Sequence, residues 1–586
     1  MSLISEHGPA AAVAGGAPLL AVDNLHVSFS TRNGVVDAVK GISLMVRPGE
    51  TLGVVGESGS GKSVTAFAIT RLLDAAGRIT QGRILFKGEN IAAASHKQLR
   101  NLHGAAVSMI FQNPRAALNP IRTIGLQISD AIGAHERISV SEGRMRALEL
   151  LRAVLIHDPE KRIDAYPHEL SGGMCQRVMI AMAIASKPAL LIADEPTTGL
   201  DVTTQKTVMD LVAKLIADRD MAMILITHDL GLAARYCQRI VVMEQGKIVE
   251  EAEPRPLFDA PQHPYTKRLV AASPTATSTI ADLAVHEGVI PGAPNGAGRE
   301  SMESRSHGSP SRASRAGNDT ENVKPSPGTP PLLEVQNLVK LYDGAVVAVD
   351  DVSFSIAAGT SLGLVGESGS GKSTISRLVC RLIDPSEGQI LFDGHAIGDQ
   401  PARGFHASPD RKDIQIVFQD PTESLNPRYT AFDCIAHPMR RLLGMKDGTA
   451  LTSRVRECAE RAGLPLDLLE RFPHQLSGGQ KARIGIARAI ACRPRLLILD
   501  EPTAALDVSV QAVILQLLDN LRRSDNLGLL FVSHDLNVVR MMCERIIVLR
   551  HGKIVEEGSN TTIFSNASHP YTRTLIDAVL NISPPR

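Results

Sequence analysis

The sequence predicts an α/β fold that occurs twice in one chain, and three observations support this prediction. Two glycine-rich loops of one pattern, at 56–63 and 366–373, each follow a short apolar run and precede a helix-like segment. Two further apolar runs end in adjacent acids, at 194–195 and 500–501. A nearly constant offset separates the matching motifs, which indicates a duplicated domain rather than chance matches.

The offset between matching residues helps to place the two domains along the chain. This offset is 310 positions between Lys62 and Lys372, and 306 between Ser171 and Ser477. Around residues 301–331 the composition turns to Ser, Gly, Pro and Arg without apolar periodicity, which is typical of a flexible linker. About 55 linker residues would reach roughly 40 Å as a coil, enough for two domains to meet face to face. We therefore expect four regions: a disordered tail at 1–18, a first domain at 19–274, a flexible linker at 275–331 and a second domain at 332–586.

Composition excludes several classes of protein. Lys plus Arg and Asp plus Glu are both 62, Trp is absent and aromatic residues make up 3% of the chain. A basic or base-stacking surface is therefore not expected, and neither is a nucleic-acid partner. No apolar run reaches the roughly 18 residues that a membrane span requires, and the first 20 residues read as a tail rather than a signal peptide. The seven Cys form no Cys-x-x-Cys pair, as in a reducing cytosol.

Each copy begins with strands. Residues 19–29 and 332–342 alternate loosely between apolar and polar, as half-buried strands do. Residues 52–55 and 362–365 are short apolar runs of the kind that form buried parallel strands. Each of these runs leads directly into a glycine-rich loop, and the strand, loop and helix order is the context that a phosphate-binding loop requires.

The two loops fit the pattern G-x-x-x-x-G-K-S. Their glycines allow backbone N–H groups to turn inward and surround an anion, and the next helix adds its positive N-terminal end. Lys62 and Lys372 would hold the β- and γ-phosphates of a nucleotide, and Ser63 and Ser373 would ligate Mg²⁺. One such loop could be a simple glycine turn, but two at matching positions disfavour that alternative. The expected nucleotide-binding residues of the loops are Gly56, Glu57, Ser58, Gly59, Ser60, Gly61, Lys62 and Ser63, and Gly366, Glu367, Ser368, Gly369, Ser370, Gly371, Lys372 and Ser373.

The acid pairs supply the second chemical element. A carboxylate at the carboxyl end of a parallel strand faces the ligand crevice, so Asp194 and Asp500 are expected to hold Mg²⁺ directly or through water. Glu195 and Glu501 would polarise an attacking water. The alternative is that the second acid of each pair only caps the following turn.

A histidine and a glutamine complete each set. His228 and His534 follow the apolar runs at 221–227 and 528–533, and we expect them to contact the γ-phosphate, although a lone His after a strand is often structural. Gln112 and Gln419 also follow strand-like runs. Their side-chain carbonyls would reach the metal or the water, and the alternative is a loop Gln without a role.

The order of glycine loop, Gln, Leu-Ser-Gly-Gly, Asp-Glu and His resembles the nucleotide-binding domain of ABC transporters, twice over nearly the whole chain. The resemblance implies two P-loop NTPase domains, each with a RecA-like α/β core, an antiparallel β part and a helical subdomain. It implies that the domains pair head to tail, with each ATP between one phosphate loop and the other Ser-Gly-Gly turn. By position, Phe29 and Tyr342 match the aromatic that stacks on adenine, and Asp201 and Asp507 match an acid that crosses the interface. The two composite sites would combine Lys62, Asp194, Glu195 and His228 with Ser477, Gly478, Gly479 and Gln480, and Lys372, Asp500, Glu501 and His534 with Ser171, Gly172 and Gly173.

A finer resemblance concerns the His-Pro-Tyr-Thr stretches at 263–266 and 569–572 and the segments 113–120 and 420–427, which look like ATPases of peptide, opine and nickel importers. From the residues alone, His-Pro-Tyr-Thr is only a turn that leads into an amphipathic helix. The resemblance implies an ATP-hydrolysing, energy-coupling component of a binding-protein-dependent importer, with di- or oligopeptides as the first expectation for cargo. Its partners would be two transmembrane permease subunits and an extracytoplasmic substrate-binding protein. Its location would be the cytoplasmic face of the inner membrane.

Two departures from the family pattern matter. Met174 stands where the signature usually continues with Gln, so we expect two unequal sites rather than one dead site. No Cys lies between Cys237 and Cys380 or after Cys543, so the iron–sulfur cluster of some relatives is not expected.

A different function stays open at this point. A soluble tandem ABC ATPase acting on ribosomes or DNA also has two such domains. Its translation-factor branch joins them by a long charged helix, and its DNA-repair branch carries zinc-binding cysteines, neither of which this sequence has. A catalytically dead scaffold conflicts with two intact acid pairs.

Overall fold

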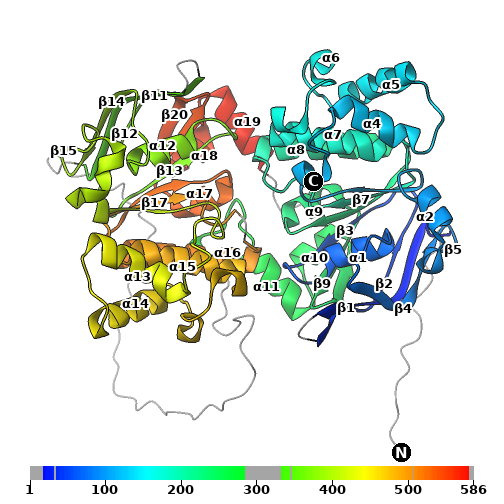
Figure 1. Ribbon diagram of the computed structural model, residues 1–586, viewed down its shortest axis with the longest axis horizontal. Helices are drawn as coiled ribbons and strands as arrows, with labels where there is room; N and C mark the ends of the chain where they lie inside the picture. The colour runs from blue at the N-terminus through cyan, green and yellow to red at the C-terminus, as the bar shows by residue number, and fades with distance from the viewer. Residues whose placement is uncertain (1–16, 32–33, 284–330, 343–345, 505, 580–586) are drawn as a thin grey trace, which may run out of the picture.

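The computed structural model describes residues 17–31, 34–283, 331–342, 346–504 and 506–579. Within these residues the chain forms two copies of one α/β architecture that lie side by side, with the first copy on the right of Figure 1 and the second on the left. This confirms the predicted duplication of an α/β fold. Most of the expected tail at 1–18 and of the expected linker at 275–331 lies outside the described residues.

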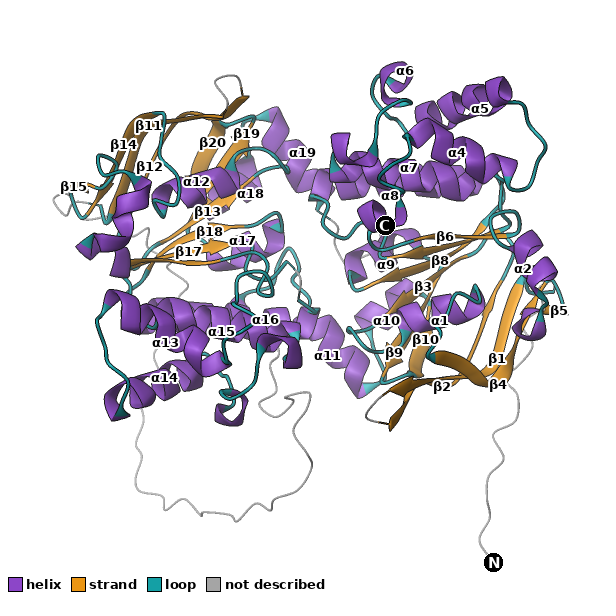
Figure 2. Cartoon of the chain, in the orientation of Figure 1, coloured by secondary structure: helices purple, strands orange, loops and turns teal. Residues whose placement is uncertain are grey.

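A six-stranded, mostly parallel sheet forms the centre of each copy, with one antiparallel strand at an edge (Figure 2). The central strands are apolar and buried at every position because helices cover both faces of the sheet. The strands of the first copy, in order across the sheet, are β10 (Lys247–Ala252), β9 (Arg239–Glu244), β3 (Thr51–Val55), β8 (Ala222–Thr227), β7 (Leu190–Asp194) and β6 (Val107–Ile110). Those of the second are β20 (Lys553–Ser559), β19 (Arg545–Arg550), β13 (Ser361–Val365), β18 (Gly528–Val532), β17 (Leu496–Asp500) and β16 (Ile414–Val417).

A smaller antiparallel sheet precedes each central sheet. Its first strand pairs with both neighbours and alternates between buried and exposed residues, because only one face packs on the core. The strands in order are β2 (Gly34–Val46), β1 (Leu20–Thr31), β4 (Gly77–Phe86) and β5 (Glu89–Asn90), and in the second copy β12 (Val346–Ile356), β11 (Leu333–Tyr342), β14 (Glu387–Phe392) and β15 (His395–Ala396).

Helices provide the remaining layers. In the first copy α4 and α5 pack on each other and on α7, and in the second α13, α14 and α15 form the corresponding helical unit. The helices of the first copy are α1 (Lys62–Ile69), α2 (His96–Leu102), α3 (Pro114–Ala117), α4 (Ile124–Gly133), α5 (Val140–Ala153), α6 (Pro159–Arg162), α7 (Gly172–Ile184), α8 (Val202–Asp218), α9 (Leu230–Tyr236), α10 (Pro254–Asp259) and α11 (Pro264–Ala272). Those of the second are α12 (Lys372–Val379), α13 (Ala431–Leu442), α14 (Thr449–Arg461), α15 (Gly478–Ile490), α16 (Val508–Asp525), α17 (Leu536–Met542), α18 (Asn560–Asn566) and α19 (Pro570–Ala578).

The last helix of each copy reaches across to the other copy. Helix α11 packs against α16, and α19 packs against α8, as the green and red helices in the middle of Figure 1 show. Apolar side chains of both copies belong to one connected hydrophobic cluster. The two copies therefore form a common apolar interface.

One part of the expected linker is not a free connection. Residues 275–283 follow α11 and pack on the second copy, where Leu283 is 1% exposed. The side-chain amide of Gln516 donates hydrogen bonds to the carbonyls of Ile280 (3.3 Å) and Leu283 (2.7 Å). The first nine residues of the expected linker, 275–283, are thus held against the second copy. The contacts of this segment are made by backbone carbonyls and by the side chains of Ile280 and Leu283, which do not form an apolar periodicity.

Candidate functional site

The glycine-rich loop of each copy joins the central strand to a helix and curls around the side chain of its lysine. Lys62 Nζ donates hydrogen bonds to the carbonyls of Gly56 and Glu57, each at 2.8 Å. Gly56 has a φ of +151°, and a Cβ there would lie 2.3 Å from the carbonyl oxygen of Met243, so only glycine fits. In the second copy Lys372 Nζ donates to the carbonyls of Gly366 (2.7 Å) and Glu367 (2.9 Å).

Each of these loops contains buried polar groups that are suited to binding a ligand. In the described part of the chain, the buried hydroxyls of Ser60 and Ser370 have no hydrogen-bond partner. Burial lowers the pKa of Lys62, although the carboxylates of Glu195, Asp507 and Asp194 oppose this. Because buried polar groups are nearly always paired in native proteins, the loops fit an anionic ligand that would accept from them.

The serine after each lysine meets the first acid of the pair. Ser63 Oγ donates to Asp194 Oδ1 at 3.0 Å, and Ser373 Oγ donates to Asp500 Oδ1 at 3.2 Å. The strands β3 and β7 bring these residues together, since both end at the same edge of the sheet. Burial raises the pKa of Asp194 to about 6 and outweighs the opposing hydrogen bond from Ser63. Hydroxyl and carboxylate oxygens are the ligands that Mg²⁺ prefers, so these pairs fit a magnesium ion.

The second acid lies at the centre of a hydrogen-bond network. The carboxylate of Glu195 accepts from Gln112 Nε2 at 2.7 Å and from Thr198 Oγ1 at 3.0 Å, and it lies 3.2 Å from His228 Nδ1. Glu195 adopts a left-handed backbone with φ of +46° while its N–H donates to the carbonyl of Ile226. A non-glycine residue in this conformation is strained, which is typical of functional sites.

The second copy repeats this arrangement. Glu501 accepts from Gln419 Nε2 at 2.7 Å, lies 3.3 Å from His534 Nδ1 and has a φ of +48°. The structure thus joins the Gln, Glu and His that the sequence analysis predicted to act together.

Electrostatics keep these acids ionised. Burial would raise the pKa of Glu195, but the hydrogen bond and charge of His228, with the hydroxyl of Thr198, outweigh it and lower the pKa to about 2. Burial would lower the pKa of His228, but the carboxylate of Glu195 raises it. Glu195 and His228 therefore each stabilise the charged form of the other.

The Ser-Gly-Gly turn opens a helix in both copies. Ser171 Oγ caps α7 by accepting from the N–H of Met174 at 3.3 Å. Ser477 caps α15 in the same way, and Gln480 Oε1 also accepts from the N–H of Ser477 at 2.9 Å. Met174 has no side-chain oxygen for this second bond, so the two turns differ as expected from the sequence.

The turn of the first copy faces the phosphate loop of the second. A cavity of about 310 Å³ lies between them, and its lining includes Ser171, Gly172, Gly173, Asp201 and Ser368. Gly172 and Gly173, which line this cavity, begin α7, and the positive N-terminal end of a helix suits an anion.

Hydrogen bonds cross between the copies at both phosphate loops. Asp507 Oδ1 accepts from the N–H of Ser58 at 2.7 Å, and Asp201 Oδ2 accepts from the N–H of Ser368 at 3.3 Å. Ser509 Oγ donates to Glu57 Oε1, and Thr203 Oγ1 donates to Glu367 Oε1 at 2.7 Å. Asp201 and Asp507 thus cross the interface, as their positions in the sequence predicted.

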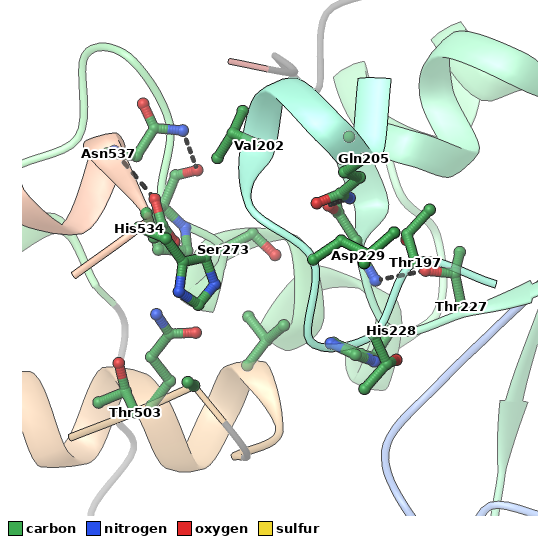
Figure 3. A pocket seen from close by; sticks show the side chains of 18 of the residues that line it. Thr197, Val202, Gln205, Thr227, His228, Asp229, Ser273, Thr503, His534 and Asn537 are labelled. Atoms are coloured by element: carbon green, nitrogen blue, oxygen red, sulfur yellow. Dashed lines mark hydrogen bonds between the residues drawn. The ribbon is translucent and has the colours of Figure 1, made fainter. Parts of the chain in front are cut away.

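A second cavity, of about 190 Å³, lies between the copies, and residues of both copies line it. Figure 3 shows His228 and Asp229 on one side and His534 and Asn537 on the other. Gln205 Nε2 donates to Asp229 Oδ2 at 3.0 Å within this cavity. Glu195, His228 and His534 therefore line one space at the interface.

Three expected residues join the site less directly. The ring of Phe29 packs against Gly77, where a Cβ would lie 2.7 Å from it. Tyr342 is 37% exposed, with Lys340 Nζ 5.2 Å from its ring centroid. Both rings lie at the ends of strands β1 and β11. The Gln480 side chain bonds within its own turn.

The sequence analysis missed one feature of the phosphate loops. Tyr265 Oη accepts from the N–H of Glu57 at 3.0 Å, and Tyr571 Oη accepts from the N–H of Glu367 at 3.1 Å. These tyrosines belong to the His-Pro-Tyr-Thr stretches, which the residues alone marked only as turns. Their recurrence at the offset of the acids and histidines was the available signal.

Comparison with known proteins agrees with this geometry. The model of the ABC transporter family matches residues 39–198 and 349–504, and that of the oligopeptide/dipeptide transporter C-terminal region matches 249–294 and 555–586. The glutathione import ATP-binding protein GsiA of Escherichia coli (strain K12) is 41% identical over 584 residues, which cover 97% of this chain and 90% of that protein.

The peptidoglycan transport ATP-binding protein YejF of Agrobacterium fabrum (strain C58) is also 41% identical, over 566 residues that cover 96% of this chain and 97% of that protein. These matches favour the importer interpretation over a tandem ATPase that acts on ribosomes or DNA. No helix among the described residues has the length and apolar character of a membrane span. The chain belongs to the ABC transporter family, as an ATPase with two ATP-binding domains and the C-terminal region of oligopeptide/dipeptide transporters.

Proposed function

We propose that this chain couples ATP hydrolysis at two composite sites to the import of a peptide across a membrane. The observation that carries the proposal is the reciprocal contact of the copies, in which Asp507 holds the phosphate loop at Ser58 and Asp201 holds the other at Ser368. Each loop thus has the opposite copy as its second wall. An ATP bound there would bridge the two copies, and its hydrolysis would release them.

The loops would bind the phosphates of ATP. Their inward N–H groups and the helix N-termini would surround the phosphate oxygens, and Lys62 and Lys372 would leave their loop carbonyls for the β- and γ-phosphates. The Ser-Gly-Gly turn of the other copy would close each site, with Gln480 supporting the turn at Ser477. Phe29 and Tyr342 would stack on adenine at the edges of the sites.

Each site would hold one Mg²⁺. Its ligands would be Ser63, Asp194 and the side-chain carbonyl of Gln112 in one site, and Ser373, Asp500 and Gln419 in the other. The side-chain nitrogens of Gln112 and Gln419 bond the neighbouring glutamates, which leaves their oxygens for a metal. When bound, Mg²⁺ would neutralise charge on the phosphate oxygens.

Glu195 and Glu501 would orient the attacking water and receive its proton. Gln and His leave acceptor sites free on each carboxylate, so a water could be held beside these partners. If His228 turns from Glu195 to the γ-phosphate, the pKa of Glu195 would rise toward the range of a useful base. His534 would act in the same way on Glu501.

The proposal extends to the transport assembly. The domains would be 19–274 and 332–586, and they would work with two transmembrane permease subunits and an extracytoplasmic binding protein. The chain would lie at the cytoplasmic face of the inner membrane. The names of the relatives support peptide cargo of the glutathione or peptidoglycan-fragment type, before opines or nickel.

ATPase measurements on purified protein test the catalytic part. Because a positioned base contributes about 10²–10⁴-fold, Glu195→Gln and Glu501→Gln should each remove the turnover of one site, and the double variant should abolish activity. ATP affinity should persist in these variants and fall in Lys62→Ala. Glu149→Gln, at an exposed helix position, is the control. Full activity in either single variant would show that its site does not contribute.

A pull-down from detergent-solubilised membranes tests the assembly. The expected result is co-purification of two multi-span permeases. Recovery of ribosomal or DNA-repair proteins without a permease would refute the transport proposal.

A further inference from the structure

The tyrosines of the two C-terminal elements contact the phosphate loops in the same way. Tyr265 and Tyr571 are 4% and 6% exposed, and their hydroxyl oxygens accept from the first N–H after the opening glycine of each loop. The residues that bond are 208 and 204 positions apart in sequence. The same hydrogen bond thus forms in each copy between two residues that are far apart in sequence. This recurrence indicates that the bond contributes to the function of each copy.

The neighbours of each tyrosine fix its position. His263 Nδ1 accepts from the N–H of Tyr265 at 3.2 Å and caps α11, and Pro264 begins the helix, where its missing N–H costs nothing. The carboxylate of Glu250 accepts from the N–H groups of Gln262 (2.8 Å) and His263 (2.9 Å). Strand β10 thus anchors the start of the helix that carries the tyrosine.

The second copy has the same anchor. His569 Nδ1 accepts from the N–H of Tyr571 at 3.1 Å, and Glu556 accepts from the N–H groups of Ser568 (2.6 Å) and His569 (3.2 Å). The His-Pro-Tyr-Thr pattern is therefore a device that holds one hydroxyl at a fixed place.

The residue that the tyrosine bonds connects three parts of the molecule. The N–H of Glu57 donates to Tyr265, its carbonyl accepts from Lys62 at 2.8 Å, and its carboxylate accepts from Ser509 of the other copy. Glu367 repeats these bonds with Tyr571, Lys372 and Thr203. Fixing this one residue therefore helps to fix both the loop lysine and the contact with the other copy.

The helix of each tyrosine also packs on the other copy. Helix α11 contacts α16, whose first turn carries Ser509, and α19 contacts α8, whose first turn carries Thr203. The loop of one copy and the helix start of the other are therefore held by the same C-terminal element.

We propose that Tyr265 and Tyr571 are positioning residues of the phosphate loops, and that each C-terminal element aligns one loop with the opposite copy. This inference rests on the proposed role of the loops in binding ATP phosphates. The tyrosines hold the backbone of the loops and not the acids or histidines, so they act on the affinity for ATP rather than on the chemical step.

Hydrogen exchange on the full-length chain, without added nucleotide, tests the contact directly. Tyr265→Phe keeps the buried ring and removes the acceptor, so exchange in the peptide that contains Glu57 should accelerate at least threefold while the loop at Glu367 is unchanged. Tyr571→Phe should give the reverse. Tyr236→Phe is the control, because it removes a tyrosine hydrogen bond to Asp210 (2.7 Å) away from both loops. Unchanged exchange at both loops in both variants would overturn the inference.

Steady-state ATPase kinetics test the consequence. Because one hydrogen bond is lost, KM for ATP should rise about threefold to tenfold in Tyr265→Phe plus Tyr571→Phe, with kcat within about twofold of the unmodified chain. An unchanged KM, or equal losses in kcat and thermal stability without a change in KM, would refute a positioning role. If the unmodified chain does not hydrolyse ATP, the proposed function fails, while the exchange experiment still decides whether the tyrosines hold the loops.

Discussion

Asp507→Ala should weaken the pairing of the two copies without weakening the fold of either. The carboxylate of Asp507 accepts a hydrogen bond from the N–H of Ser58 at 2.7 Å. Although Asp507 precedes α16, its side chain forms no cap hydrogen bond with that helix. Hydrogen bonds to charged groups contribute about 1.5–3 kcal/mol. Because this one is partly exposed to solvent, we expect the lower end, which corresponds to a pairing equilibrium about tenfold less favourable.

Asp201→Ala provides the contrast. Asp201 accepts from Thr203 Oγ1 (2.7 Å) and from the N–H of Thr204 (3.0 Å), so it caps α8 inside its own copy. Its bond across the interface, to the N–H of Ser368, is longer at 3.3 Å. Losing the cap should cost about 0.5–2 kcal/mol of folding stability, with a smaller effect on pairing than in Asp507→Ala.

Two measurements separate these effects. Energy transfer between dyes on Cys introduced at His157 and Asp447, which are 94% and 79% exposed, reports pairing within one chain, and the seven native Cys are all buried. Thermal unfolding reports the fold. Asp507→Ala should lower the paired fraction at an unchanged Tm, and Asp201→Ala should lower Tm. The reasoning would be refuted if Asp507→Ala kept the paired fraction of the unmodified chain. It would also be refuted if both variants changed the paired fraction and Tm in the same way.

Two further predictions follow from single contacts. Gly479→Ala should lower Tm more than Gly173→Ala, because the new methyl group would lie 2.6 Å from Val510 Cγ1 rather than 3.2 Å from Thr204 Cγ2, and such overpacking costs about 1–3 kcal/mol; equal Tm values would contradict this. Glu556 has a pKa lowered to about 2, since hydrogen bonds from Ser568 and the N–H of His569 outweigh burial. The stabilisation that ionised Glu556 provides is therefore complete above about pH 4.5 and is lost as the pH falls toward 2. Glu556→Gln should thus show a shallower fall of Tm between pH 5 and 3 than the unmodified chain. Parallel curves of Tm against pH for the two proteins would contradict this.

The sequence predicted the parts of the structure that local patterns encode. The runs before Gly56, Asp194 and His228 are short, apolar and unbroken, which is typical of buried parallel strands. Because such strands end at one edge of the sheet, their terminal residues had to meet, and Ser63, Asp194, Glu195 and His228 do meet. Because each motif occurs twice at a nearly constant offset, its interpretation does not depend on a single match.

Other contacts depend on how distant elements pack, and no local pattern encodes them. The bond between Tyr265 and Glu57 needs the C-terminal helix to return to the first loop, and the bonds of Gln516 with the carbonyls of residues 280 and 283 need the copies to pair. The residue types that make these bonds are common in proteins and do not by themselves indicate such contacts. The segment 275–283 for this reason has the composition of a linker, although its backbone carbonyls accept hydrogen bonds from Gln516.

The fusion of the copies explains why their interface is unequal. Two identical chains that pair by a twofold axis must use the same residues at both contacts, whereas fused copies can diverge because each surface meets only one partner. Asn537 Nδ2 donates to the carbonyl of Pro274, and Gln516 holds the following segment, but the matching positions of the first copy are Gly231 and Asp210, which cannot donate these bonds.

The same divergence affects the crossing acids and the signature turns. Asp201 is bound inside its own copy and reaches across at 3.3 Å, whereas Asp507 reaches across at 2.7 Å, and Met174 lacks the second cap bond that Gln480 makes. The chemical groups of the two sites are nevertheless the same. Both sets of acids and histidines thus match, while the contacts that bring the copies together differ. Any difference between the sites should therefore appear in how tightly each closes rather than in how each would hydrolyse ATP.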